Sequence, residues 1–466
     1  MTATLQPPPP PPPPQTRRHA RASAQTGGPP APGRPARRRA VTTPATMRSL
    51  LTALLLLSLA WGAFGGWVAS VHSSAASAMA AVDEPPSLDA QQLYQSIADA
   101  DVTATTMFLA SSHPPLASLQ VYQGDVATAA ARLSTLRAAG GQNRTASAAL
   151  ATLSGDLPLY TGYVAEARSA YALGYPLTGG SFVQVASEEA HLDLLPAAKT
   201  VFNQENDVLA AASGQATGLP LVIAALVLAI VTGVLLFRAQ RWLTRRTNRV
   251  LNLGLALASL LLVISALWLL AGFLSGRSNL EAGIAHGSRP AQQLAQASID
   301  VQQIRGDAVL NVISRSGDAS FQSDFSDTSG QVGPGDVSPG HLSLLSSAAA
   351  AENSGTQAAA LVADAEREAT AWYAANANVY TLGKKANYAG ERSAVIGSGT
   401  GSSAVGYDAL EPDISRAIGD DQAAFSTAVS AGSGALNPVE PVVIIAALLM
   451  ALGCWRGLSR RLAEYR

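Results

Sequence analysis

Residues 219–274 place two apolar stretches on either side of a basic segment: LPLVIAALVLAIVTGVLLF (219–237), RAQRWLTRRTNR (238–249) and VLNLGLALASLLLVISALWLLAGFL (250–274). A helix needs roughly 20 apolar residues to cross the hydrocarbon core of a bilayer. The middle segment has five Arg and no acidic residue, and basic residues near the ends of spans stay on the cytoplasmic side. The stretch therefore predicts two membrane-spanning helices joined by a basic cytoplasmic loop.

Two further apolar stretches, 50–71 and 441–458, complete the pattern. The segment before the first has eight Arg and no acid, and the C-terminal end has four Arg and one acid, Glu464. The long segment 72–218 has 5 basic and 13 acidic residues, and 275–440 has 9 and 18. By the same charge rule we expect a four-pass protein of the plasma membrane, with both termini and the short tail 459–466 in the cytoplasm and both long segments outside.

The N-terminal segment has a different character. Residues 1–49 are rich in Pro and Arg, with an unbroken proline run at 7–14. This composition buries too little apolar surface to fold, so we expect a disordered cytoplasmic tail held near anionic lipid by Arg; a polyproline ligand for a cytoplasmic partner is the alternative. Met47 is an alternative start. The stretch 50–71 is also compatible with a cleaved signal peptide, because Arg48 precedes it and Ala-Ser-Ala follows at 76–78.

The composition predicts an all-α fold for the two outer segments. The single cysteine, Cys454, lies in the last apolar stretch, so no disulfide within the chain can stabilise these segments and they must fold by packing alone. Alanine is abundant and aromatic residues make up only 6% of the chain, which favours closely packed helices over a β-sandwich.

Apolar periodicity and Pro or Gly boundaries give the expected helices of each segment. In the first they predict helices at 89–110, 116–139, 143–174 and 181–213, with a turn at Pro176 and Gly179–Gly180. In the second they predict helices at 278–315, 342–383, 386–396 and 407–431, with loops at 316–340 and 397–406. Because two helices of each set continue into spans, we expect two extracytoplasmic helical bundles, 72–218 and 275–440.

Short sequence echoes indicate a tandem duplication of a span–bundle–span unit. The tetrapeptide AQQL occurs at 90–93 and at 291–294, YALG at 171–174 is echoed by YTLG at 380–383, and LLP at 194–196 by LEP at 410–412. The three echoes keep the same order and the same places relative to the spans. A repeated unit is the simplest origin of such an ordered set.

No catalytic motif is evident. The sequence has no P-loop, no His-Glu-x-x-His helix and no Gly-x-Ser-x-Gly turn, so we expect a protein that is not an enzyme and has no cofactor or metal. His191 stands beside Glu188, Glu189 and Asp193, which fits a solvated helix face better than a metal site. The glycine-rich segment 397–403 lacks the lysine and the preceding strand of a phosphate cradle. An acidic loop lacks EF-hand spacing and comprises Asp318, Asp324, Asp327 and Asp336.

Other residues are expected to pack rather than to bind. The aromatic residues of the outer segments fall near helical spacing, which predicts that most are core: Tyr122, Tyr160, Tyr163, Tyr171, Trp372, Tyr373 and Tyr380. In the spans, Thr232 and Asn252 are candidates for hydrogen bonds between helices, and glycines allow close approach, namely Gly62, Gly65 and Gly66. No ligand-binding or partner-binding residue is assigned.

Several stretches resemble actinobacterial four-pass membrane proteins of the GlnX type. They include LPLYTGY at 157–163, LLPAA at 194–198, AWYAA at 371–375 and DQAAF at 421–425, within a likeness that covers about residues 42–460. The segment around Lys384-Lys385 departs from the group, which tends to be more acidic there. The resemblance implies a sensor that works beside a glutamine-binding-type solute lipoprotein outside the cell and informs a soluble Ser/Thr kinase, protein kinase G, inside.

We therefore expect a non-enzymatic transmembrane sensor or signalling adaptor that interacts with the lipid bilayer. The acidic outer segments exclude nucleic acid as a partner. A structural or envelope-assembly protein is the alternative. A transporter accessory subunit is the weaker one, because the apolar stretches lack the paired charges and broken helices of transport sites.

Overall fold

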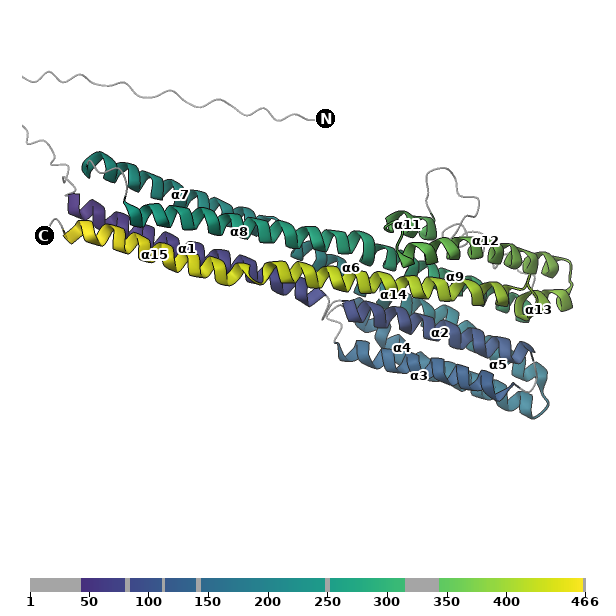
Figure 1. Cartoon of the computed structure of the whole chain (residues 1–466). Helices are drawn as coiled ribbons and strands as arrows, with labels where there is room; N and C mark the ends of the chain where they lie inside the picture. The colour runs from purple at the N-terminus through teal and green to yellow at the C-terminus, as the bar shows by residue number, and fades with distance from the viewer. Residues whose placement is uncertain are drawn as a thin grey trace, which may run out of the picture.

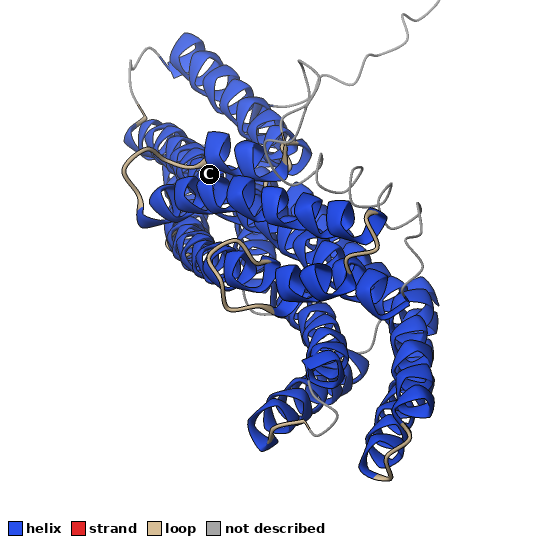
Figure 2. Ribbon diagram, turned by 90° about the vertical axis from the view of Figure 1, so that its right-hand side faces the viewer, coloured by secondary structure: helices blue, strands red, loops and turns tan. Residues whose placement is uncertain are grey.

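The computed structural model describes residues 43–79, 84–110, 114–139, 144–247, 252–314 and 343–463. Within these ranges every regular element is a helix, as the all-α expectation requires (Figure 2). The helices form an elongated molecule (Figure 1). One end, the membrane bundle, is made of α1, α7, the first part of α8, and α15; the other end, which we call the head, contains the remaining helices.

The four helices of the membrane bundle are α1 (Thr43–Ala78), α7 (Pro220–Thr247), α8 (Leu253–Gly283) and α15 (Val439–Ala463). α1 and α8 each pack against both α7 and α15, around a shared apolar core that includes Trp61, Leu262 and Met450. In the part of the chain that the structure describes, four helical runs are long and apolar enough to cross a membrane. Large side chains such as Ile230 and Leu267 stay exposed on the outside of the bundle, where lipid would cover them. The chain is thus a four-pass membrane protein.

Small residues bring the spans together. A Cβ on Gly62 would overlap the Cβ of Ala447, and one on Gly65 would lie 2.9 Å from Cγ1 of Val443, so the close contact of α1 and α15 confirms the role expected of these glycines. The Nδ2 of Asn252 donates to the carbonyl of Gly457 at 2.9 Å, which confirms its interhelical bond. The expectation for Thr232 was wrong, because its hydroxyl donates to the carbonyl of Leu228 in its own helix.

The first head bundle follows α1. Its helices are α2 (Glu84–Ala110), α3 (Leu116–Ala138), α4 (Arg144–Ala172), α5 (Pro176–Glu189), a π-helical turn η2 (Ala190–Leu194) and α6 (Leu195–Ala216). The turn expected at Pro176 and Gly179–Gly180 is the first turn of α5 instead. Pro is well tolerated at a helix N-terminus, and Gly179 leaves room for the Tyr171 ring, 2.6 Å from where its Cβ would be.

The second head bundle is continuous with the third span. α8 runs through the π-helical turn η3 (Ile284–Ser288) into α9 (Arg289–Ser314), and the remaining helices are α11 (Leu344–Ala351), α12 (Gln357–Lys384), α13 (Tyr388–Ile396) and α14 (Ser403–Leu436). The single helix expected at 342–383 is divided in two, because Gly355 adopts a φ of +91° and the Thr356 hydroxyl caps α12. The acidic loop around Asp318 and Asp336 lies outside the described residues.

The two head bundles share one hydrophobic core. α2 and α14 both pack against α9 (Figure 1). The core includes Tyr160 and Leu194 from the first bundle and Trp372 and Leu410 from the second. Five of the seven aromatic residues expected to be core are buried, and Tyr163 and Tyr171 are half-buried at its edge. The head is thus a single body built from two segments.

Two boundaries differ from expectation. Residues 43–49, assigned to the disordered tail, belong to α1, and Met47 is buried. The basic loop at 238–249 is helical as far as Thr247, because α7 continues beyond its apolar stretch. The tandem duplication remains a prediction, since the two bundles differ in how their helices join the spans.

Candidate functional site at the interface of the two bundles

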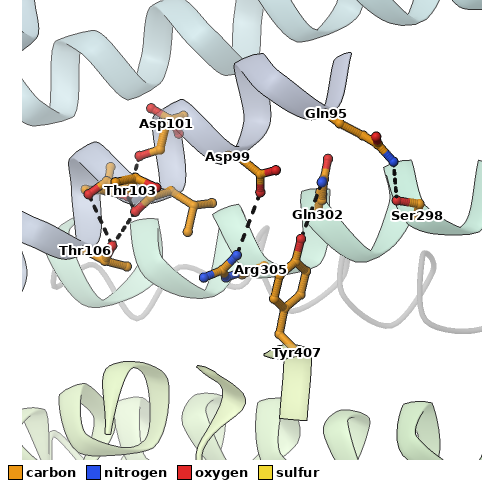
Figure 3. A network of polar contacts seen from close by, with 11 residues as sticks. Gln95, Asp99, Asp101, Thr103, Thr106, Ser298, Gln302, Arg305 and Tyr407 are labelled. Atoms are coloured by element: carbon orange, nitrogen blue, oxygen red, sulfur yellow. Dashed lines mark hydrogen bonds and ion pairs between the residues drawn. The ribbon is translucent and has the colours of Figure 1, made fainter. Parts of the chain in front are cut away.

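A strip of polar side chains lies between α2 and α9, where the first bundle meets the second (Figure 3). On α2 the residues Gln95, Asp99 and Thr103 follow at intervals of four, so they share one helix face. On α9, Ser298, Gln302 and Arg305 share a face in the same way. The Nε2 of Gln95 donates to the Ser298 hydroxyl at 3.0 Å. The two faces therefore meet as a polar seam in an otherwise apolar core.

Arg305 forms the first charged node of the seam. Its Nη1 lies 3.9 Å from Oδ1 of Asp99, and its guanidinium lies over the Tyr407 ring, 3.9 Å from the ring centroid, in cation–π geometry. The Nε2 of Gln302 donates to the Tyr407 hydroxyl at 3.4 Å. Burial raises the pKa of Asp99, while the Arg305 charge and a hydrogen bond with Tyr407 oppose that rise. One arginine of α9 thus joins the first bundle to α14.

His191 forms the second node. Oδ2 of Asp101 accepts a hydrogen bond from the Ser187 hydroxyl at 2.8 Å and lies 3.3 Å from Nε2 of His191. The Nδ1 of His191 lies 3.8 Å from Oδ1 of Asp307 on α9. A Cβ on Gly306 would be 2.9 Å from Cε1 of His191, so this position must stay open. The imidazole therefore bridges carboxylates of the two bundles.

The sequence-based interpretation of His191 was wrong. Only 18% of its side chain is exposed, and its partners come from α2 and α9 rather than from the neighbouring Glu188, Glu189 and Asp193. The π-helical turn η2 contains His191, and such a turn shifts the register of the side chains that follow it. A single-helix pattern cannot reveal this, because the partners are distant in the sequence.

A third node lies closer to the membrane bundle. The Nζ of Lys199 on α6 lies 3.5 Å from Oδ1 of Asp300, which also accepts a hydrogen bond from Nε2 of Gln296 at 2.7 Å. Asp300 is buried; burial raises its pKa, and the Lys199 charge counteracts this. All three nodes connect the first bundle to α9, so the seam couples the bundles through charge as well as apolar packing.

The chemistry of the seam is that of an interface. No group of three His, Cys, Asp or Glu among the described residues is placed to hold a metal ion. The carboxylates are paired with Arg305, His191 and Lys199 across helix boundaries. Paired buried charges of this kind depend on each other, because removal of one leaves its partner buried and uncompensated. A small displacement of the whole first bundle along α9 would therefore change all three nodes together.

The His191 node predicts a pH-dependent interface. Burial alone would lower the pKa of His191, but the hydrogen bond and charge of Asp101 and the charge of Asp307 raise it above 6.5. A raised folded-state pKa means that the stabilisation is fully present below the unfolded pKa and is lost as pH rises through the folded one. We expect the melting temperature of the wild type to fall relative to that of His191→Gln as the pH rises above about 6.5, the unperturbed pKa of histidine.

The comparison with His191→Gln isolates the imidazole from other groups that titrate in this range, such as Asp125, whose pKa burial raises to about 6. Thermal melts of the full-length chain in detergent at several pH values provide the measurement. Parallel pH profiles of the two melting temperatures would show that folding does not shift the pKa of His191, and would contradict the prediction.

Among known proteins, a similarity is found for the first head bundle. No curated protein and no solved structure matches the chain. The family match covers α2 through most of α6 together with the end of α1, so it includes Asp99, Asp101 and His191 but no residue of α9. Residues 75–214 match the family model described as an actinobacterial sensor domain, which supports a sensor role for this membrane protein.

Proposed function

We propose that this chain is a non-enzymatic transmembrane sensor or signalling adaptor that relays the state of an extracytoplasmic head to a cytoplasmic partner. The sensor-family match of residues 75–214 supports the sensing half of the proposal. The relay half rests on how the head is attached to the membrane bundle. The charge asymmetry of the sequence supports an outer head, since the basic segments lie at the other ends of the spans.

The continuity of the helices is the single observation that carries the relay. The helical run Leu253–Ile313 is 61 residues long and Ser403–Ser459 is 57, about three times the length that a span requires. Each run therefore extends from the membrane bundle into the core of the head. A helix transmits a shift or rotation along its axis, because its backbone bonds are internal.

The first bundle is attached differently. Between α6 and α7 the backbone leaves the helical conformation at Thr217–Leu219, and α1 and α2 are separate helices. α14 and α15 are joined by the two-residue turn Asn437–Pro438, in which Asn437 keeps helical dihedral angles. We call the runs Leu253–Ile313 and Ser403–Ser459 the two rods; each is joined directly to a span. In the proposed mechanism the first bundle moves against these two rods. In this mechanism a partner binds the first bundle, the polar seam shifts, and α9 and α14 carry the displacement inward.

The proposed partners follow from the resemblance to GlnX-type proteins. Outside, a glutamine-binding-type solute lipoprotein would bind the head. Inside, a soluble Ser/Thr kinase would bind the cytoplasmic end of the membrane bundle and respond to its conformation. The end of α7 offers a surface for the inner partner, since Arg238, Arg241 and Arg245 are exposed and share one face. Such a face suits an acidic or phosphorylated surface.

A reversible crosslink across the seam tests the relay. Gln95→Cys and Ser298→Cys are introduced together with Cys454→Ala, and intact spheroplasts are treated with a membrane-impermeant bis-methanethiosulfonate. We expect the crosslink to form from outside and to abolish the response of kinase-dependent phosphorylation to amino-acid limitation. A reductant should restore the response. The reason is that the crosslink joins α2 to α9 and prevents displacement of the first bundle.

The matched control is Arg137→Cys with Ser154→Cys, whose side chains meet at 2.9 Å between α3 and α4 within the first bundle. This crosslink should leave the response intact. Crosslinking only after lysis would contradict the outer position of the head. A normal response with the seam locked would contradict the relay and favour the structural or envelope-assembly alternative.

A further inference from the structure

An acidic cavity lies where the second bundle meets the third span. It has a volume of about 430 Å³. Its walls come from η3 with the end of α8, from the segment between α11 and α12, and from α14. Asn353 and Thr356 in its wall lie on either side of Gly355, whose φ is +91° and where the helix is interrupted. The cavity is separate from the polar seam and contains none of its residues.

Three carboxylates line the cavity without a compensating cation. They are Glu352, Asp420 and Asp421, and no Lys or Arg is among the described lining residues. His286 also lines it, and its Nδ1 lies 2.7 Å from the carbonyl of Ala351. Buried carboxylates in proteins are normally paired with a cation, because an isolated buried charge is costly. This cavity therefore has a strong excess of negative charge.

Each of the three carboxylates also has a buried oxygen with no donor. When the carboxylates are ionised, Oδ2 of Asp421, Oε1 of Glu352 and Oδ2 of Asp420 accept no hydrogen bond from the described residues. Asp421 is the most enclosed, with 1% of its surface exposed. More than nine in ten buried polar groups in native proteins have a partner. The missing partner must be able to donate several hydrogen bonds within the cavity.

The three carboxylates hold one another's charge in check, and Asp421 is affected most. Burial raises the pKa of Asp421 to about 9, with further contributions from a hydrogen bond and the charge of Glu352 and from the charge of Asp420. At neutral pH the Asp421 carboxyl is thus protonated and shares its proton with Glu352. A cationic ligand would stabilise the ionised pair and release that proton.

Size and geometry favour an organic cation over a metal ion. No three acidic or His side chains among the described residues converge on one point as metal ligands. A volume of about 430 Å³ falls in the range of small-molecule sites. An ammonium group has three donors, one for each unpartnered oxygen. We propose that this cavity binds a small organic cation through a primary ammonium group held by Asp421, Glu352 and Asp420.

The ligand would contact both rods of the second bundle. Asp420 and Asp421 belong to α14, whereas Gly283 and His286 belong to the α8–η3–α9 rod. The rods touch closely here, because a Cβ on Gly287 would lie 2.9 Å from the carbonyl oxygen of Asp421. Cation binding would therefore set the spacing of the two rods just outside the spans. The site goes beyond the proposed relay and does not require it.

Binding to the full-length protein in detergent tests the proposal. The probe is 1,4-diaminobutane, and butane-1,4-diol is its uncharged counterpart of the same length. We expect calorimetric binding and a raised melting temperature with the diamine, and neither effect with the diol. Asp421→Asn and Glu352→Gln should each weaken diamine binding at least about tenfold, because each removes a charge that faces the ammonium.

The matched control is Glu166→Gln, which removes the same charge from an exposed position of the first bundle and should leave binding unchanged. Asp421→Asn should fold, since it replaces a carboxyl that already carries a proton. If Asp421→Asn does not fold, Glu352→Gln tests the same binding site. Binding of CaCl2 but not of the diamine would overturn the proposal in favour of a metal site. Equal stabilisation by the diol, or unchanged binding in both variants, would also overturn it. A protein that binds no diamine but passes the crosslinking test would lose only this site.

Discussion

Replacing Trp372 with alanine is expected to lower the free energy of unfolding by about 3–5 kcal/mol, the usual range for removal of a large buried aromatic side chain. Trp372 is completely buried in the core that both head bundles share. Its Nε1 donates to the carbonyl of Ser403 at 3.0 Å, so the substitution also leaves a buried acceptor without its donor. Gly406 packs directly on the indole: a Cβ at this position would lie 2.8 Å from Cδ1 of Trp372. Because glycine has no side chain, it cannot fill the space that the indole leaves.

Thermal melts of the full-length protein in detergent provide the measurement. A loss of this size in the free energy of unfolding corresponds to a fall in melting temperature of roughly 6–20 °C for a head of this length. The melting temperature of Trp372→Phe should lie between those of the wild type and Trp372→Ala, because phenylalanine keeps most of the ring contacts but lacks the hydrogen-bond donor. Tyr175→Ala is the control, since Tyr175 is 62% exposed. Equal shifts for Trp372→Ala and Tyr175→Ala would contradict the single shared core.

Replacing Gly62 with valine is expected to destabilise the membrane bundle by about 1–3 kcal/mol, the usual cost of overpacking. A Cβ at this position would overlap the Cβ of Ala447 on α15. Neither atom belongs to a flexible side chain, so the two helices must separate. Van der Waals contact between helices is a main source of stability in membranes, and separation loses that contact along the whole α1–α15 interface.

The control for this prediction is Gly434→Val. Gly434 is also a helical glycine, but a Cβ there would meet nothing within 4 Å. In a helix the change from Gly to Val is itself slightly favourable, so Gly434→Val should be neutral or weakly stabilising. Melting of the detergent-solubilised protein compares the two variants. If Gly62→Val proved as stable as Gly434→Val, the close contact of α1 and α15 would be wrong.

The layout of the chain was readable from its sequence. The four apolar stretches and the all-α class follow from local properties: span length is set by the thickness of the bilayer, and helical periodicity by 3.6 residues per turn. The bounds of α3 and α13 agree with expectation to within two residues. Misjudged boundaries had local causes with little sequence signal, such as the positive φ of Gly355 and the continuation of α7 to Thr247.

The candidate site was not predictable in the same way. The polar residues at 95, 99 and 103 have helical spacing, so the sequence did contain a signal for a polar helix face. The apolar residues of the same helix gave a similar periodicity, and the polar face was not recognised. Their partners on α9 lie about 200 positions further along the chain. His191 illustrates the difficulty. Its acidic neighbours in the sequence are Glu188, Glu189 and Asp193, but the carboxylates that lie within 4 Å of its ring are those of Asp101 and Asp307.

The sequence by itself determined where the chain meets the membrane and which residues form helices, because both depend on interactions within one helix or between a helix and its solvent. Only the tertiary structure decided that the two head bundles share one core, that His191 bridges them, and that Glu352 and Asp421 line one cavity with no Lys or Arg among its described lining residues. Those features depend on contacts between helices that are far apart in the chain. The pairing of such helices is set by the shape and packing of complete surfaces, which no local pattern of residues specifies.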